Sequence, residues 1–413
     1  FFFAFAMVTF CSAQAQIKVL SSFEDSDGLG DYSSFDVLSE QLKEVKVVGM
    51  GESTHGTSEF FGMRLKMFRY LVEQHQFTTL YLEDEYATCL ELNKYIQGQN
   101  HSCEEYVAQL SNWPWKTHEF VEVMNWMRRH NELYPEHQVR IVGVDMQDYQ
   151  PAFEALDRLF TRHGMNTHFG KDTVVTDVSR GLLKDHTLKH LDSLTTEAEV
   201  VLNKLILNEA DSLQGITLLR HLEQSRTASR RYERSFRDVQ MAENLLRDLN
   251  LKEDRKGFFW AHNGHVCNLR YQRNKKKPIV YWAGGKLREQ LGNAYFVVLQ
   301  DFAQGSFNAY HLKAHHLDKE EFTNYNLGEV ELGWESEKFF AFGHHPGNTS
   351  ELMTVDLLKP RRKYIRFHSI GAEYTPKNLG GSGGRGHIYL EPHYYNCVLL
   401  VARSTPSHLL STK

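Results

Sequence analysis

Carboxylate and imidazole side chains stand directly after four apolar segments of this 413-residue sequence. One segment is followed by a glutamate and a histidine, Glu52 and His55, and another by two histidines, His262 and His265. The other two are followed by acidic residues: Glu83, Asp84, Glu85 and Asp145. A histidine oriented by a carboxylate can act as a general base on water, while other donors stabilise the oxyanion of an ester or amide. These residue types therefore predict a hydrolytic site.

The same residues allow two other interpretations of the function. Imidazole and carboxylate groups can hold a divalent metal that activates water, and the ligands would be Glu52, His55, Glu83 and either His262 or His265. The last two are three residues apart in a loop rather than four apart on a helix, so we expect no cofactor and keep the metal as an alternative. A non-catalytic binding protein is the other reading, although a binding site has no need for so many titrating groups. Ser53 lies close by, but no nucleophile motif surrounds it, so a covalent acyl-enzyme is less favoured.

Parallel strands can bring these distant residues together. Apolar runs predict buried strands at Val45–Met50, Thr79–Leu82, Val139–Val144 and Gly257–Ala261. The carboxyl ends of such strands form one edge of an open α/β sheet, which is where ligands bind. The predicted fold class is therefore α/β, with a mostly parallel sheet flanked by helices. Two more strands are predicted at Ile279–Trp282 and Tyr295–Leu299.

A long charged segment with helical periodicity separates the predicted sheet into two parts of the sequence. We expect residues 16–150 and 255–300 to form the α/β catalytic domain, and residues 151–254 to form a helical insertion that serves as a lid, an arm or a wall of the cleft. Residues 301–413 change character and predict a smaller C-terminal α+β portion with short strands.

Several further residues are candidates for contact with the reacting groups or the substrate. Arg64 follows His55 on the next helix, and its guanidinium can hold a carboxylate in place or bind an oxyanion. Two tryptophans in one loop can line a pocket, and an acid and an arginine can join the polar site. The candidate substrate-binding residues are Trp113, Trp115, Asp145 and Arg237.

Composition limits the partners and the location of the protein. The net charge of −5 offers no basic field for a nucleic acid. Residues 1–15 are apolar and end in Ala13-Gln14-Ala15, which predicts a signal peptide and an exported, periplasmic or secreted protein. That apolar run is too short to span a bilayer, so no stable membrane span is expected in the mature chain. The remaining cysteines fit no zinc motif, and export permits a disulfide without requiring one: Cys89, Cys103, Cys267 and Cys397.

Several of these motifs, taken in order, resemble the erythromycin esterase family. They are GESTHG at 51–56 with Arg64, the strand that ends at Glu83, GVDMQ at 143–147, RDVQMAENL at 237–245, WAHNGHV at 260–266, RFHSIGAEYTP at 366–376 and STP at 404–406. The resemblance runs over nearly all of the sequence after residue 15.

This resemblance implies a function and a set of site residues. It implies a sheet domain, an inserted helical region and a small α+β portion, and hydrolysis of a small-molecule ester or macrolactone by water that a loop histidine activates. By position, His55 resembles that base, and the residues that match the family's polar site are Glu52, Glu83, His262, His265 and Arg64. Metal dependence differs among family members, so the resemblance implies no metal.

Overall fold

The computed structural model describes residues 18–20, 35–99, 102–108, 110, 112–172, 185–230, 235–272, 279–311, 327–332, 350–354, 365–374 and 387–411. The signal peptide predicted at residues 1–15 lies outside these ranges and stays a prediction, as does export. In the described ranges, no helix has the length and apolar character needed to cross a bilayer.

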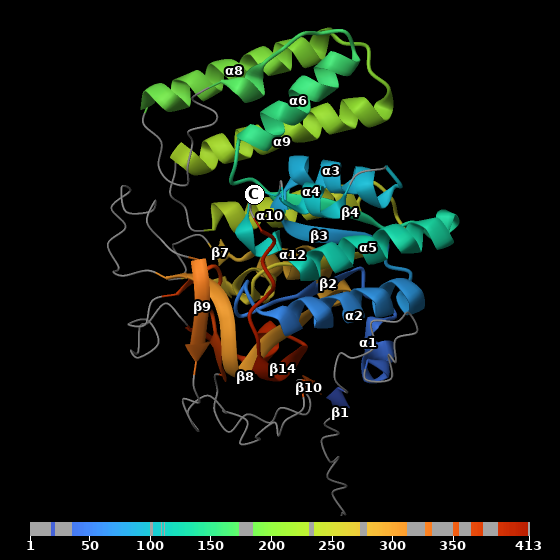
Figure 1. Ribbon diagram of the computed structural model, residues 1–413, viewed down its shortest axis with the longest axis vertical. Coiled ribbons are helices and arrows are strands. Elements are labelled where there is room, and N and C mark those ends of the chain that lie inside the picture. Colours follow the sequence, from blue (N-terminus) through green and yellow to red (C-terminus); the bar gives the residue numbers. More distant parts are fainter. Residues whose placement is uncertain are drawn as a thin grey trace, which may run out of the picture.

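A ten-stranded sheet runs through the molecule (Figure 1), in the order β1-β10-β14-β8-β2-β5-β3-β4, with β9 and β12 paired to β8. Its central strands are parallel: β2 (Val47–Met50), β3 (Thr79–Glu85), β4 (Arg140–Asp145), β5 (Gly257–Trp260), β8 (Tyr295–His311) and β14 (Cys397–Ser404). The other members are β1 (Lys18–Leu20), β9 (Leu327–Leu332), β10 (Ser350–Thr354) and β12 (Glu373–Tyr374), of which only β12 is parallel to its neighbour. The prediction of a mostly parallel α/β sheet is confirmed.

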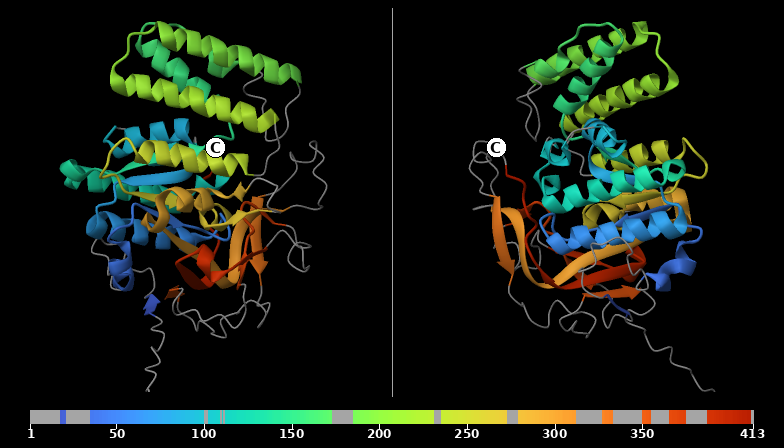
Figure 2. Two further views of the ribbon diagram at one scale, coloured as in Figure 1. Left: turned by 180° about the vertical axis from the view of Figure 1, so that it is seen from behind. Right: turned by 45° about the vertical axis from the view of Figure 1, so that its right-hand side comes forward.

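Helices cover both faces of this sheet, as the two views of Figure 2 show. Because successive strand residues point to opposite faces, Val48 and Phe258 pack on one side while Val47 and Phe259 pack on the other. The first side is covered by α1 (Ser39–Leu42), α2 (Ser58–His75), α3 (Tyr86–Ile96), α4 (Cys103–Ala108) and α5 (His118–Leu133). The second is covered by α10 (Phe236–Leu249) and α12 (Ala283–Leu291).

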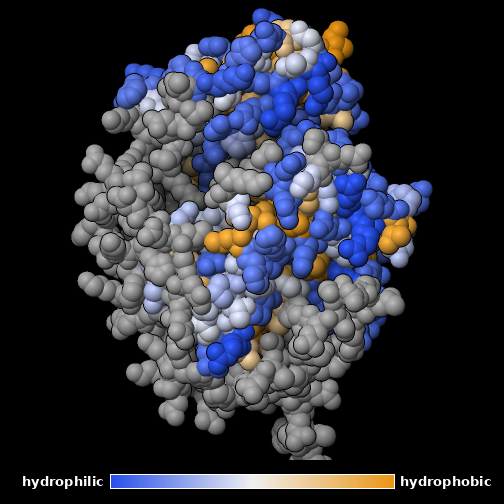
Figure 3. All heavy atoms as spheres, viewed as in Figure 1, coloured by the Kyte–Doolittle hydropathy of each residue, from blue (hydrophilic) through white to orange (hydrophobic). Residues whose placement is uncertain are grey.

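Three further helices form a separate layer beyond α3, at the top of Figure 1: α6 (Gln150–Arg162), α8 (Asp185–Lys204) and α9 (Glu209–Arg230). They share their own core, in which Phe153, Leu191 and Leu218 are buried. The face that this layer shows in Figure 3 is mainly hydrophilic. The insertion predicted at 151–254 spans this layer but also spans α10, which packs on the sheet because Met241 and Leu245 are buried against it.

Some predicted strands are placed differently in the structure. The segment predicted at Ile279–Trp282 lies outside the main sheet: among the described strands, β7 (Val280–Tyr281) pairs with β6 (Arg270–Tyr271) alone. The residues predicted to form a C-terminal α+β portion also contribute β14 to the main sheet beside β8, while β11 (Ile365–His368) and β13 (His387–Leu390) pair apart. The other short helices within the described residues are η1 (Asp36–Leu38), η2 (Trp113–Trp115), η3 (Pro135–His137), η4 (Phe169–Lys171), α11 (Asn263–Val266), η5 (Gly292–Ala294) and η8 (Pro392–Tyr394).

The cysteines predicted to remain after signal cleavage are free and buried, at Cys89, Cys103, Cys267 and Cys397. Burial raises the pKa of the Cys103 thiol to about 12. None of them lines the cavity described below. Thiol chemistry therefore has no place in the candidate site.

Candidate active site

The loop that carries Glu52 and His55 leaves the carboxyl end of β2 and is bonded to the loop that follows β5. Gly51 permits this approach, because a Cβ atom there would stand 2.2 Å from Oδ1 of Asn263. The backbone N–H of Asn263 then donates to the carbonyl oxygen of Glu52 at 2.8 Å. Two loops that are about 200 residues apart in the sequence are thus fixed side by side at one edge of the sheet.

Glu52 is a buried carboxylate held between two partners. Its Oε2 accepts a hydrogen bond from Nη1 of Arg64, and its Oε1 lies 2.5 Å from Nδ1 of His55. Arg64 is itself fully buried, and its guanidinium lies 4.7 Å from the ring centre of Trp260. Burial alone would raise the pKa of Glu52, but Arg64 and His55 outweigh it and hold that pKa below its ordinary value. Glu52 is therefore ionised and accepts a hydrogen bond from Nδ1–H of His55, which leaves Nε2 of that ring as the basic nitrogen.

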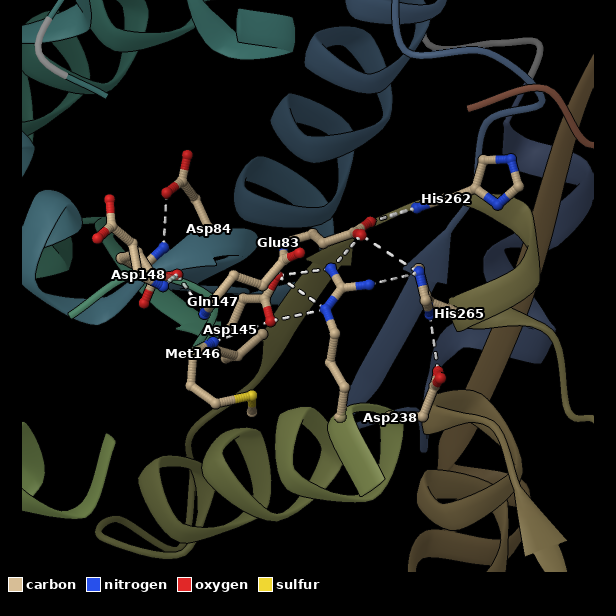
Figure 4. A network of polar contacts seen from close by, with 12 residues as sticks. Glu83, Asp84, Asp145, Met146, Gln147, Asp148, Asp238, His262 and His265 are labelled. Carbon is tan, nitrogen blue, oxygen red and sulfur yellow. Dashed lines mark hydrogen bonds and ion pairs between the residues drawn. The ribbon is translucent and has the colours of Figure 1, made fainter. Parts of the chain in front are cut away.

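A second set of ion pairs lies beside this one, at the ends of β3 and β4 (Figure 4). Arg237, at the start of α10, donates to Oε1 of Glu83 at 2.7 Å and to both carboxylate oxygens of Asp145. Nε2 of His265 lies 3.2 Å from the same Glu83 oxygen, and its Nδ1 lies 2.7 Å from Oδ1 of Asp238. One guanidinium and one imidazole thus join three carboxylates that come from three elements.

Electrostatics fixes the charge of these groups. Burial would lower the pKa of His265, but Glu83 and Asp238 raise it to about 10. Burial would raise the pKa of Glu83, yet His265 and Arg237 hold it well below its ordinary value. Nη1 of Arg237 also lies 3.2 Å from Nε2 of His265, but the two carboxylates outweigh this positive neighbour, so His265 is an imidazolium at neutral pH and a poor general base. In the structure, His265 supplies a positive charge that is paired with Glu83 and Asp238.

This raised pKa predicts how stability depends on pH. Folded His265 keeps its proton up to about pH 10, whereas the unfolded side chain loses it above about pH 6.5. The contribution is complete below pH 6.5 and is lost as pH rises toward 10, at about 1.4 kcal/mol per pH unit. We expect wild type to lose about 2 kcal/mol more than His265→Asn between pH 7.5 and 9 in urea denaturation. Parallel pH profiles of the two proteins would contradict the assignment.

The carboxylates next to Glu83 point away from this cluster and hold the loop after β4. Oε1 of Glu85 accepts hydrogen bonds from the backbone N–H groups of Gln147 and Asp148. Oδ1 of Asp84 accepts from the backbone N–H of Glu85 at 2.6 Å. Burial and the neighbouring Asp145 raise the pKa of both groups, in the case of Asp84 to about 7. Their contacts are those of loop supports.

The two clusters meet at a cavity of about 230 Å³. Its wall consists of His55, Glu83, Asn112, Pro114, Trp115, Gln147, Arg237, His262, His265, Gly371 and Ala372. Among the residues predicted from sequence, Glu52, Arg64 and Asp145 lie behind this wall and support the groups in it. Trp113 is outside the wall and packs edge-on against Tyr310, with ring centres 5.8 Å apart. Asn112 was not singled out from the sequence although it precedes the tryptophan loop, because an asparagine in a loop is usually a turn residue.

Two of the residues named as a metal-binding alternative, Glu52 and His265, already have other partners in this arrangement. Both oxygens of Glu52 already accept hydrogen bonds, from His55 and Arg64. Both nitrogens of His265 face carboxylates, those of Asp238 and Glu83. Within the described residues, no three His, Cys, Asp or Glu side chains are grouped so as to hold a metal ion. We therefore derive no step of the reaction through a metal.

Solved structures share this fold over most of their length. A Bacillus cereus protein matches with a TM-score of 0.69 and 19% identity over 96% of this chain and 97% of its own. A protein described as a succinoglycan biosynthesis protein has the same TM-score, with 18% identity over 96% of each chain. A mutant of erythromycin esterase EreC in its open conformation also gives 0.69, with 14% identity over 96% of this chain and 100% of that one. At these identities the similarity shows the fold alone.

Sequence comparison gives the family. Erythromycin esterase type II of Escherichia coli is 25% identical over 134 residues, which is 32% of this chain and 31% of that protein. Type I from the same organism is 38% identical over 53 residues, 13% of each chain. These alignments span less than a third of the relatives' length. The profile of the family named erythromycin esterase matches residues 72–331, which is more than half of the sequence, and the chain therefore belongs to the erythromycin esterase family.

Proposed function

We propose that this protein hydrolyses a carboxylic ester of a small molecule by direct attack of water, with His55 as the general base. One observation carries the proposal: His55 lines the cavity while its Nδ1 is bonded to a buried, ionised Glu52 that Arg64 holds in place. That arrangement fixes the tautomer and the orientation of the imidazole, which general-base catalysis requires. Membership of a family named for an esterase supports the same reaction class.

The reaction can be written with all protons assigned. Nε2 of His55 takes a proton from water as the water oxygen bonds to the ester carbon, and the charge moves to the carbonyl oxygen. The carboxylate of Glu52 stabilises the imidazolium that results, because it accepts from Nδ1–H throughout. The same Nε2–H then gives its proton to the leaving alcohol as the carbon–oxygen bond breaks. The products are an acid and an alcohol, and no covalent intermediate with the protein forms.

Neighbouring groups hold this machinery rigid. Arg64 is fully buried, so its guanidinium would be left without a partner if Glu52 moved away from it. This contact holds the carboxylate of Glu52 in place beside His55. Arg237 and His265 hold Glu83, whose Oε2 accepts the backbone N–H of His262 at 2.8 Å. The ion pairs at the ends of β3 and β4 thereby fix the opposite wall of the cavity.

The size of the cavity bears on the substrate. A volume of about 230 Å³ lies below the range of roughly 300–1,000 Å³ that is usual for drug-sized ligands. We infer that it receives the ester group and its near neighbours, and that the remainder of a macrolactone would lie outside it. The layer of α6, α8 and α9 contributes no residue to the described cavity wall. We propose that this layer contacts the outer part of a large substrate and influences which ring size is accepted.

A hydrolysis screen tests the proposed function. Purified protein, treated with a chelator, is incubated with macrolides of smaller and larger ring size and with small acyl esters, and products are detected by mass spectrometry. We expect a mass gain of one water with at least one ester, and activity that the chelator leaves unchanged. Hydrolysis of small esters alone would remove macrolactones from the proposal. Binding without any mass gain across the panel would favour a non-catalytic binding protein instead, and activity that returns only with added metal would favour the metal mechanism.

A further inference from the structure

His262 lies edge-on beside His55 at the cavity wall, and a contact with the backbone fixes the position of its proton. It is the N-cap residue of α11, where the backbone N–H of Gly264 donates to its Nδ1 at 3.1 Å. Because a backbone amide can only donate, Nδ1 must carry the lone pair. In the neutral ring the single proton is then on Nε2. The local chain therefore selects the Nε2–H tautomer without help from any other side chain.

The Nε2 atom of His262 is buried and has no hydrogen-bond partner among the residues that the structure describes. Figure 4 shows the ring pointing away from the Glu83 and His265 cluster. Its centre lies 5.4 Å from that of His55, in an edge-on arrangement, and both rings line the cavity. A buried N–H without an acceptor costs about 1–3 kcal/mol. Such a donor at a cavity wall is suited to an acceptor that arrives with the substrate.

The charged groups around His262 keep it neutral. The rings of His55 and His265 lie beside it, with centres 5.4 and 6.2 Å away, and Glu83 and Glu52 are the nearby carboxylates. Burial and the two neighbouring histidines lower its pKa to about 3, in spite of the two carboxylates. At neutral pH the ring is not protonated to an imidazolium, so it cannot act as a general acid. It cannot act as a general base either, because Nδ1 already accepts the N–H of Gly264. What remains is a neutral hydrogen-bond donor.

The cavity stays open beside the two imidazoles because residue 371 is glycine. Gly371 adopts a left-handed φ of 66°, and a Cβ atom there would stand 3.6 Å from Nε2 of His55 and 3.9 Å from Cδ2 of His262, the carbon bonded to Nε2. The backbone carbonyl of Gly371 accepts from the N–H of His55 at 3.1 Å, so this segment is fixed to the loop that carries His55. A side chain at this position would occupy the space next to both nitrogens.

We propose that His262 is the oxyanion donor of this site: its Nε2–H hydrogen-bonds the ester carbonyl oxygen, in the space that Gly371 leaves open. The assignment rests on the proposed function and gives the second half of its chemistry. As His55 takes the proton of water, negative charge grows on the carbonyl oxygen, and the Nε2–H of His262 stabilises it. The proton stays on His262 throughout, and the bond becomes stronger in the transition state than in the ground state.

Two substitutions separate this role from the structural role of the N-cap. His262→Asn keeps a short side-chain acceptor for the N–H of Gly264, and asparagine is a good N-cap residue, but it has no group at the position of Nε2. His262→Gln does the reverse, because its amide nitrogen reaches the position of Nε2 while the cap contact is lost. With p-nitrophenyl acetate, we expect His262→Asn to lower kcat about 100-fold with little change in KM or Tm, the usual effect of losing one oxyanion donor. We expect His262→Gln to be at least about tenfold more active than His262→Asn, in spite of a lower Tm.

Two results would overturn the assignment. One is wild-type kcat in His262→Asn, and the other is equal loss in both variants. A third measurement does not depend on turnover: ¹⁵N NMR of the histidine rings, with the His262 signal assigned from the spectrum of His262→Asn, should show an Nε2–H tautomer that does not titrate between pH 5 and 9. A proton on Nδ1, or titration in that range, contradicts the proposal. Loss of kcat in His262→Asn together with full activity in His55→Ala would instead show that the general base was wrongly assigned.

Discussion

His55→Ala is expected to lower kcat for any accepted ester by roughly a hundredfold or more, the usual scale for loss of a general base. The imidazole lines the cavity and is held by Glu52 at 2.5 Å, so its removal deletes the group that accepts the proton of water. KM should change little, because the ring contributes more to the transition state than to substrate binding. Initial rates at saturating substrate measure the effect.

Two further variants make this result specific. Glu52→Gln keeps the shape of the partner but removes its charge, so we expect a loss of kcat with the position of His55 largely retained. His163→Ala is the matched control, because His163 is also bonded to a carboxylate, that of Asp211, but lies in the helical layer away from the cavity. It should leave kcat at the wild-type level. Full activity in His55→Ala would remove this histidine from the mechanism.

Arg237→Met is expected to lower the free energy of unfolding by about 3–5 kcal/mol, the scale for removing one partner of a buried ion pair. The guanidinium contacts Glu83 and Asp145, which are buried and would be left with less positive charge nearby. Methionine retains an apolar stem of similar length, so the loss reports mainly the missing charge. Equilibrium denaturation in urea measures it.

A surface ion pair provides the control for this prediction. Arg162→Met breaks the pair with Asp211, but its side chain is 47% exposed, so a change below about 1 kcal/mol is expected. The double variant Arg237→Met with Asp145→Asn should recover part of the loss, because one of the stranded charges is removed with its partner. Equal effects of Arg237→Met and Arg162→Met would show that the cluster at the end of β4 adds little to stability.

Much of the fold followed from local patterns in the sequence. The strands that carry the site were predicted because a buried parallel strand is a short apolar run, and each of these runs ends at an ionisable residue. The same pattern predicted a strand at Ile279–Trp282, and β7 is found there, but its partner is β6 and not a strand of the main sheet. An apolar run indicates a strand without indicating which strand lies beside it. For the same reason, the sequence did not indicate that β14 pairs with β8, which is about 100 residues away in the chain.

The sequence by itself determined which chemical groups stand at the ends of the strands, because that depends only on residue type and order. Only the tertiary structure decided what each group does. Glu83 and Arg237 are 154 residues apart, and their contact sets the charge of the cluster. His262 and His265 are three residues apart and chemically identical, yet the pKa of one is lowered to about 3 and that of the other raised to about 10. The reason is that ionisation depends on burial and on the charges within a few ångströms, and both are set by residues that the chain brings together only when it folds.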